Sequence, residues 1–162
     1  MAPPYCIDPD HFLDLSGSVA VNRDDVRAAW EKAYALLEQR LAEVGATATL
    51  YVVFGIQGGG KTTWVSANAT LRGQNAIFFS GPLPSRKHRA RALVLAKTAR
   101  CRTVAVWINA AFEVAMERNS RRSGQACIRE EAIRHVYESL EPPSIEEGFH
   151  ELIEVRAENA EA

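Results

Sequence analysis

Acidic residues are missing from the middle of the sequence. Residues 44–112 contain no aspartate or glutamate, although they contain nine lysines and arginines. All twenty acidic residues lie in the flanking segments, eight before and twelve after, so the net charge of the chain is only −1. We therefore expect a positive surface of the kind that holds polyphosphates or nucleic acid. The alternative is that these cations pair with acidic neighbours in the fold.

Long hydrophobic runs are also absent, and cysteines are few. The apolar run at residues 49–55 is far shorter than the roughly 20 residues that cross a bilayer, so we expect no membrane helix and no membrane partner. The first residues lack the basic start and apolar stretch of a signal peptide, which favours a cytoplasmic protein. The three cysteines, Cys6, Cys101 and Cys127, have no metal-ligand spacing and are expected to be reduced structural thiols.

The remaining composition is that of an ordinary soluble protein, with 162 residues, 47% hydrophobic and 24% charged. This length predicts one domain over residues 1–162. We expect an irregular N-terminal arm over about residues 1–17 and an irregular tail over about 156–162.

Strands and helices alternate along the sequence. Strands are expected at 18–22, 49–54, 75–80, 102–109 and about 149–155, and helices at about 23–44, 61–69, 85–100, 110–120 and 128–140. Such alternation predicts an α/β fold with three layers, in which helices cover both faces of a mostly parallel sheet of about four to five strands.

A glycine-rich segment follows the expected strand at 49–54. Residues 55–62, GIQGGGKT, match G-x-x-x-x-G-K-[ST] between a strand and a helix, the context that the P-loop requires. Glycines allow backbone amides to turn toward phosphates, Lys61 is expected to reach the outer phosphates, and Thr62 to coordinate Mg²⁺. The residues expected to bind ATP, or another nucleoside triphosphate, are Gly55, Gln57, Gly58, Gly59, Gly60, Lys61, Thr62 and Thr63.

The strand expected at 75–80 ends in Ser80, where many P-loop proteins have an aspartate that supports the magnesium ion. The hydroxyl of Ser80 is able to hold a metal-bound water, but it carries no charge and is a poor base near neutral pH. The acid must therefore come from another part of the chain, or the protein binds nucleotide without transferring phosphate.

A basic segment, RNSRRSG at residues 118–124, connects two expected helices. Arginines on such a connection can close over a bound nucleotide and stabilise charge on a phosphoryl group in transfer. The alternative is a solvated basic turn.

Four segments together resemble the 5'-hydroxyl polynucleotide kinase family of small P-loop kinases. They are GKTTW at 60–64, SRKHRARAL at 85–93, ERNSRR at 117–122 and ESLEPPSIEEGF at 138–149. The resemblance covers roughly residues 20–155 and implies transfer of the γ-phosphoryl group of ATP to a polynucleotide 5'-hydroxyl.

Members of this family typically have a segment like NRDDxR after the helix that follows the P-loop. This chain has NRDDVR at residues 22–27, before the P-loop, which suggests a permuted order of elements. The resemblance then implies that Asp24 is the base, that Arg27 orients it, and that Arg118 and Arg122 are the lid arginines. Ser80 departs from the family, whose members have an aspartate there.

Several alternatives remain open from the sequence. Residues 22–27 also fit a plain helix start, with Asn22 as cap and Asp25 near the helix dipole, and Asp8 and Asp10 are rival acids. The acceptor is either a nucleic-acid 5' end or a small molecule such as a sugar nucleotide or an antibiotic, and a third hypothesis is a nucleotide-binding module or weak NTPase. The cations that are candidates for contacting a nucleic-acid backbone, or for forming a solvated helix face, are Arg86, Lys87, Arg89 and Arg91.

Overall fold

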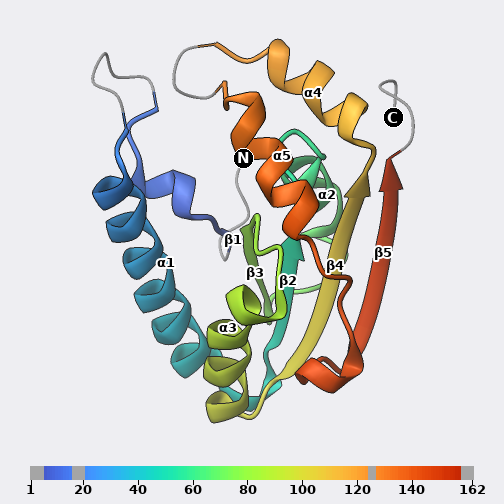
Figure 1. Cartoon of the computed structure of the whole chain (residues 1–162). Helices are drawn as coiled ribbons and strands as arrows, with labels where there is room; N and C mark the ends of the chain where they lie inside the picture. Colours follow the sequence, from blue (N-terminus) through green and yellow to red (C-terminus); the bar gives the residue numbers. More distant parts are fainter. Residues whose placement is uncertain (1–5, 16–20, 124–126, 158–162) are drawn as a thin grey trace.

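The computed structural model describes residues 6–15, 21–123 and 127–157, which form an α/β fold around one parallel sheet (Figure 1). The strands lie in the order β1-β3-β2-β4-β5, and every neighbouring pair is parallel. Their bounds are β1 Cys6–Ile7, β2 Thr49–Phe54, β3 Ala76–Gly81, β4 Arg102–Ala110 and β5 Glu151–Ala157. The expectation of an α/β fold with a parallel sheet of about four to five strands is confirmed.

Helices cover both faces of the sheet, as expected, and two more lie near the carboxyl ends of the strands (Figure 1). The α-helices are α1 Arg23–Val44, α2 Lys61–Asn68, α3 Arg86–Ala99, α4 Phe112–Ser120 and α5 Glu130–Ser139. Short 3₁₀-helices are η1 Pro9–Phe12, η2 Gly45–Thr47 and η4 Ile145–Glu147. Within the described ranges, no helix is long and apolar enough to cross a membrane.

The first strand lies elsewhere than the sequence predicts. Of the strand expected at 18–22, residues 18–20 lie outside the described residues, and Val21 and Asn22 belong to no strand. Instead β1 pairs with β3, with Cys6 opposite Phe78. The expected irregularity is thus wrong for residues 6–12, which form β1 and η1, and for residues 156–157, which end β5. A strand of two residues is too short to show an alternating pattern.

The start of α1 follows directly from its sequence. The side chain of Asn22 accepts a hydrogen bond from the amide of Asp25 at 2.9 Å, and the Asp25 carboxylate accepts one from the amide of Asn22 at 3.1 Å. This reciprocal pair is a capping box, which satisfies two backbone donors at the helix end. The carboxylate of Asp25 is therefore committed to the helix start.

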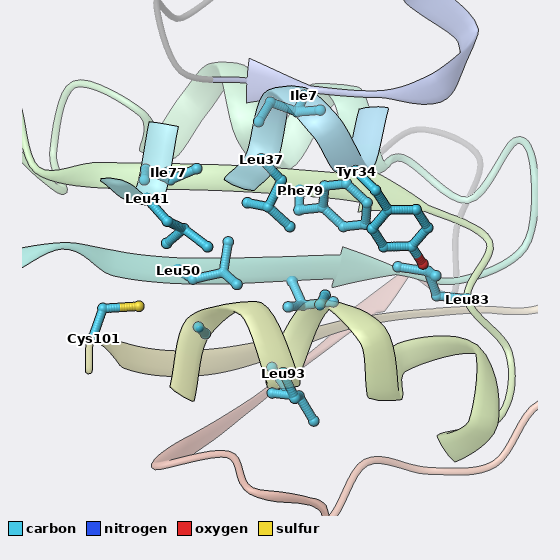
Figure 2. Close-up of a cluster of buried hydrophobic side chains, with 14 of the residues drawn as sticks. Ile7, Tyr34, Leu37, Leu41, Leu50, Ile77, Phe79, Leu83, Leu93 and Cys101 are labelled. Carbon is cyan, nitrogen blue, oxygen red and sulfur yellow. The ribbon is translucent and has the colours of Figure 1, made fainter. Parts of the chain in front are cut away.

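The larger hydrophobic core lies between the sheet and the helices α1 and α3 (Figure 2). Ile7 from β1, Leu37 from α1 and Phe79 from β3 meet there, and none of them is more than 1% exposed. A smaller cluster on the α2 face includes Phe78 and Val106. Because Ile7 is packed into the main core, β1 is held at the sheet edge and the residue that follows it, Asp8, is placed at the carboxyl end of the sheet.

The cysteines in this structure are free thiols, as the sequence predicts. Burial, together with the nearby charge of Asp8, raises the pKa of Cys6 to about 11. Burial also raises the pKa of Cys101. Both thiols are therefore protonated near neutral pH and are weak nucleophiles.

Two cations of α3 form ion pairs within the fold. Arg89 is fully buried and donates hydrogen bonds from Nε and Nη2 to the two carboxylate oxygens of Glu147, at 2.9 and 3.1 Å. Arg91 is exposed and donates to Glu31 at 2.7 Å. For these two arginines the structure shows pairing with acidic neighbours, the alternative noted above, and it leaves the exposed Arg86 and Lys87 as the cations at the start of α3.

Candidate functional site

The glycine loop, residues 55–60, joins the end of β2 to the start of α2. Gly58 has φ +81°, and a Cβ atom there would come within 2.5 Å of the carbonyl oxygen of Ala115 in α4. Gly60, with φ +107°, is the N-cap residue of α2. Both positions favour glycine because left-handed backbone strains other residues. The loop can therefore turn tightly in front of α2 while lying directly against α4.

Lys61 is drawn into the glycine loop. Its Nζ donates hydrogen bonds to the carbonyl oxygens of Gly55 and Ile56, at 2.8 and 3.0 Å. Burial lowers the pKa of Lys61 to about 8, against the opposing effect of the Asp8 charge. The first turn of α2 contains no acidic residue, so the positive end of the helix dipole is left uncompensated and can attract an anion.

The glycine loop opens onto a cavity of about 860 Å³. The residues expected to bind nucleotide that line it are Gln57, Gly58, Gly59, Gly60, Lys61, Thr62 and Thr63, whereas Gly55 lies outside the lining. The Oε1 atom of Gln57 is buried and has no hydrogen-bond partner among the described residues. A cavity lined by a glycine loop, a lysine and a helix N-terminus is chemically suited to a polyphosphate.

Both predicted lid arginines lie at this cavity. Arg118, near the end of α4, donates a hydrogen bond from Nη1 to the carbonyl oxygen of Gly59 at 3.1 Å. Arg122 lines the same cavity, and its charge contributes to lowering the pKa of Lys61. Arg129, the N-cap residue of α5, also lines the cavity and was not singled out from the sequence. No local motif marks Arg129, because only the packing of α5 brings it to the cavity.

Asp8 and Asp10 are the only acidic residues among the described residues that line the cavity. Asp8 follows β1 directly, and its Oδ1 accepts a hydrogen bond from the amide of Asp10 at 2.9 Å. Burial is the largest cause that raises the pKa of Asp8 above its usual value; the charge of Asp10 raises it further, and Lys61 opposes the shift. The half-buried carboxyl group of Asp8 thus lies within electrostatic reach of the lysine of the glycine loop.

The structure does not bring Asp24 and Arg27 to the cavity. Both are exposed in the first turns of α1, and neither lines it. The α1 residues that do line it are Val26, Ala29 and Trp30, and at 100° per residue Asp24 lies on the other side of the helix from them. The segment NRDDVR fits the helix-start interpretation, because Asn22 and Asp25 form the capping box.

Ser80 lies on β3, paired with Val53 of β2. Its Oγ is buried and has no hydrogen-bond partner among the described residues, and Ser80 is not part of the cavity lining. In residues 6–15, 21–123 and 127–157, no group of three or more His, Cys, Asp or Glu side chains is arranged to hold a metal ion. Thr62 lines the cavity and offers a hydroxyl ligand for Mg²⁺. This ion needs few protein ligands, because it usually keeps several waters and binds substrate phosphates.

In comparisons with known proteins, no family model and no curated protein sequence matches this chain. The decisive features are a glycine loop with its lysine, arginines from α4 and the connection after it, and one half-buried carboxyl group at the same cavity.

Proposed function

We propose that this protein is a P-loop phosphotransferase that moves the γ-phosphoryl group of ATP, or of another nucleoside triphosphate, to an acceptor hydroxyl. The observation that carries the proposal is that Asp8 and Lys61 line one cavity and shift each other's pKa. A half-buried carboxyl group beside the loop is the kind of group that takes the proton from an acceptor hydroxyl. The parallel sheet and the loop after β2 also support a P-loop NTPase fold.

The glycine loop, Lys61, Thr62 and the two lid arginines each have a role in this proposal. The amides of the glycine loop and the ammonium group of Lys61 hold the phosphates, and the hydroxyl of Thr62 holds Mg²⁺, which neutralises charge on the phosphate oxygens. Arg118 and Arg122 stabilise the charge of the phosphoryl group during transfer. Ser80 is given no role, because it does not line the cavity.

In the proposed reaction Asp8 is the general base. The acceptor O–H bond breaks and its proton moves to the Asp8 carboxylate while the acceptor oxygen forms a bond to the γ-phosphorus. The bond from that phosphorus to the bridging oxygen breaks, and the nucleoside diphosphate leaves with the electron pair. The raised pKa of Asp8 suits this task, because a base whose pKa lies closer to neutral pH takes up a proton more readily.

A polynucleotide 5'-hydroxyl is one candidate acceptor, on the strength of the sequence resemblance. The fold offers it limited support, since Arg89 and Arg91 of the basic helix are paired with Glu147 and Glu31. A small hydroxyl compound is the other candidate. A nucleotide-binding module without transferase activity is the alternative of a different class.

The test compares Asp8→Asn with Asp24→Asn. Transfer of label from γ-labelled ATP is measured to a panel of hydroxyl acceptors that includes a 5'-hydroxyl oligonucleotide. Asp8→Asn retains the oxygen that caps η1 and should reduce transfer by about 10² to 10⁴-fold while nucleotide affinity changes little. Asp24→Asn, the matched control, should retain full transfer.

Three results would count against the proposal. Equal loss in both variants would mean that neither carboxylate acts specifically, and loss in Asp24→Asn alone would return the role of base to Asp24. ATP binding by the unmodified protein without transfer to any acceptor of the panel would favour the nucleotide-binding module.

A further inference from the structure

The cavity extends past Asp8 to an apolar side. Leu13 follows η1, and Val26, Ala29 and Trp30 come from the first turns of α1, which packs against η1. Gly81, the last residue of β3, completes this side. We name the surface formed by Leu13, Val26, Ala29, Trp30 and Gly81 the acceptor side, because it adjoins the proposed base, Asp8.

Trp30 is held in place by its neighbours. A Cβ atom on Gly81 would lie 2.6 Å from Cη2 of the Trp30 ring, so the ring lies directly against the end of β3. The ring also packs against Tyr34, with centroids 5.8 Å apart, and edge-on against Phe79, at 6.2 Å. The half-buried ring therefore offers the cavity an aromatic surface that needs no rearrangement to bind a ligand.

Charge is divided between the sides of the cavity. The lining cations come from the start of α2, from α4 and the connection after it, from the N-cap of α5, and from β5; they are Lys61, Arg118, Arg122, Arg129 and Arg156. Next to the acceptor side, the charged residues in the described lining are Asp8 and Asp10. An anionic acceptor packed beside Trp30 would have these two carboxylates as neighbours, and their repulsion disfavours its binding.

Resting on the proposed function, we propose that the acceptor is a compact hydroxyl compound without an anionic group, whose aromatic or apolar ring packs against Trp30 and whose hydroxyl group reaches Asp8. Polynucleotides and nucleotide-linked sugars are less suited to this side, because a phosphate group beside Asp8 and Asp10 would be repelled. The acceptor must be compact because the cavity of about 860 Å³ has to hold both the nucleotide and the acceptor. A pocket for one ligand alone usually has roughly 300–1,000 Å³.

The experiment measures probe binding without chemistry. The protein is saturated with a non-hydrolysable ATP analogue, which occupies the glycine loop, and the dissociation constants of 2-phenylethanol and phenylacetate are measured by ligand-observed NMR. The two probes share a ring and chain length but differ in charge. We expect 2-phenylethanol to bind about tenfold more tightly or better, a difference of about 1.4 kcal/mol. Equal binding, or tighter binding of phenylacetate, overturns the proposal.

Variants then locate the probe. Trp30→Ala should weaken 2-phenylethanol binding about tenfold or more, and Trp30→Phe should restore most of it, because the lost contact is burial of apolar surface. The matched control is Trp107→Ala: Trp107 packs against the same core cluster as Trp30 but does not line the cavity. Asp10→Asn should reduce the ratio of the dissociation constant of phenylacetate to that of 2-phenylethanol, because one of the two repelling charges is removed. Equal weakening by Trp107→Ala, or an unchanged preference in Asp10→Asn, contradicts the assignment.

The outcome of the probe-binding experiments is independent of the transfer assay that tests the proposed function. If labelled phosphate is transferred but the probes fail as described, only the acceptor class is wrong. If the probes bind as expected but Asp8→Asn leaves transfer unchanged, the acceptor side stands and the role of Asp8 falls.

Discussion

Lys61 and Asp8 are two groups of opposite charge at one cavity. Burial lowers the pKa of Lys61 and raises the pKa of Asp8, so it favours the neutral form of each. In the nucleotide-free protein the pKa of Lys61 is about 8, so the side chain is mostly charged at pH 7 and mostly neutral at pH 9. A triphosphate binds the charged form. Phosphate binding should therefore raise the pKa of Lys61 and keep its side chain charged.

This shift gives the affinity for ATP a definite dependence on pH. As pH rises through about 8, the free protein loses the Lys61 proton that binding requires, so the dissociation constant should increase, approaching about tenfold per pH unit above that value. Titrations of a fluorescent ATP analogue between pH 7 and pH 9 measure the change. Lys61→Arg, whose charge persists, should bind with a flat profile over this range, and an equal slope in that variant would assign the effect to another group.

At the scale of elements, Arg89 connects the start of α3 to η4, just before β5. Besides its two hydrogen bonds to Glu147, Nη1 donates to the carbonyl oxygens of Leu83 and Pro84 at 3.0 and 3.2 Å. The guanidinium group also lies 4.5 Å from the centroid of the Phe54 ring, at the end of β2. Most of the donors of this buried cation are therefore satisfied, and the cation links α3 and the segment after β3 to η4, which precedes β5.

Removing the acidic partner should destabilise the protein strongly. In Glu147→Gln the Arg89 charge stays buried without its counter-charge, which should lower the free energy of unfolding by about 3–5 kcal/mol. Urea unfolding followed by circular dichroism measures this change. Glu31→Gln is the matched control. It removes the α1 partner of Arg91, which is on the same helix as Arg89, from an exposed pair and should change the midpoint of unfolding little. If Glu147→Gln and Glu31→Gln lowered the free energy of unfolding equally, burial of the Arg89–Glu147 pair would not be the cause of the destabilisation.

At the scale of the whole molecule, the cavity is assembled from separate parts of the chain around the carboxyl ends of the strands. The described lining includes residues that follow β1, the glycine loop, the first turns of α1, the end of α4, the start of α5 and the end of β5. A ligand that filled this cavity would contact residues from several helices and strands at once. Its binding should therefore stabilise the folded chain as a unit.

Heat denaturation tests this coupling. At an ATP concentration about 100-fold above the dissociation constant, the free energy of unfolding should increase by about 2.7 kcal/mol, which for a chain of this size raises Tm by roughly 5–10 °C. Lys61→Met should lose most of this shift. A full Tm shift in that variant would place the nucleotide outside the glycine loop. The control is Val94→Ala, on the exposed side of α3, which should retain the full Tm shift.

The sequence by itself determined the parts of this protein that local chemistry specifies. The glycine loop follows from glycines that allow left-handed backbone, α1 from the cap of Asn22 and the stop at Gly45, and β2 from a run of buried apolar residues. Only the tertiary structure decided which acid meets the loop. Asp24 carries the more suggestive motif, but the phase of α1 turns it away from the cavity, whereas Asp8 is brought there because Ile7 is buried against Leu37 and Phe79. That placement depends on a two-residue strand pairing with residues about seventy positions later in the chain, and local sequence patterns carry no signal for contacts over such a distance.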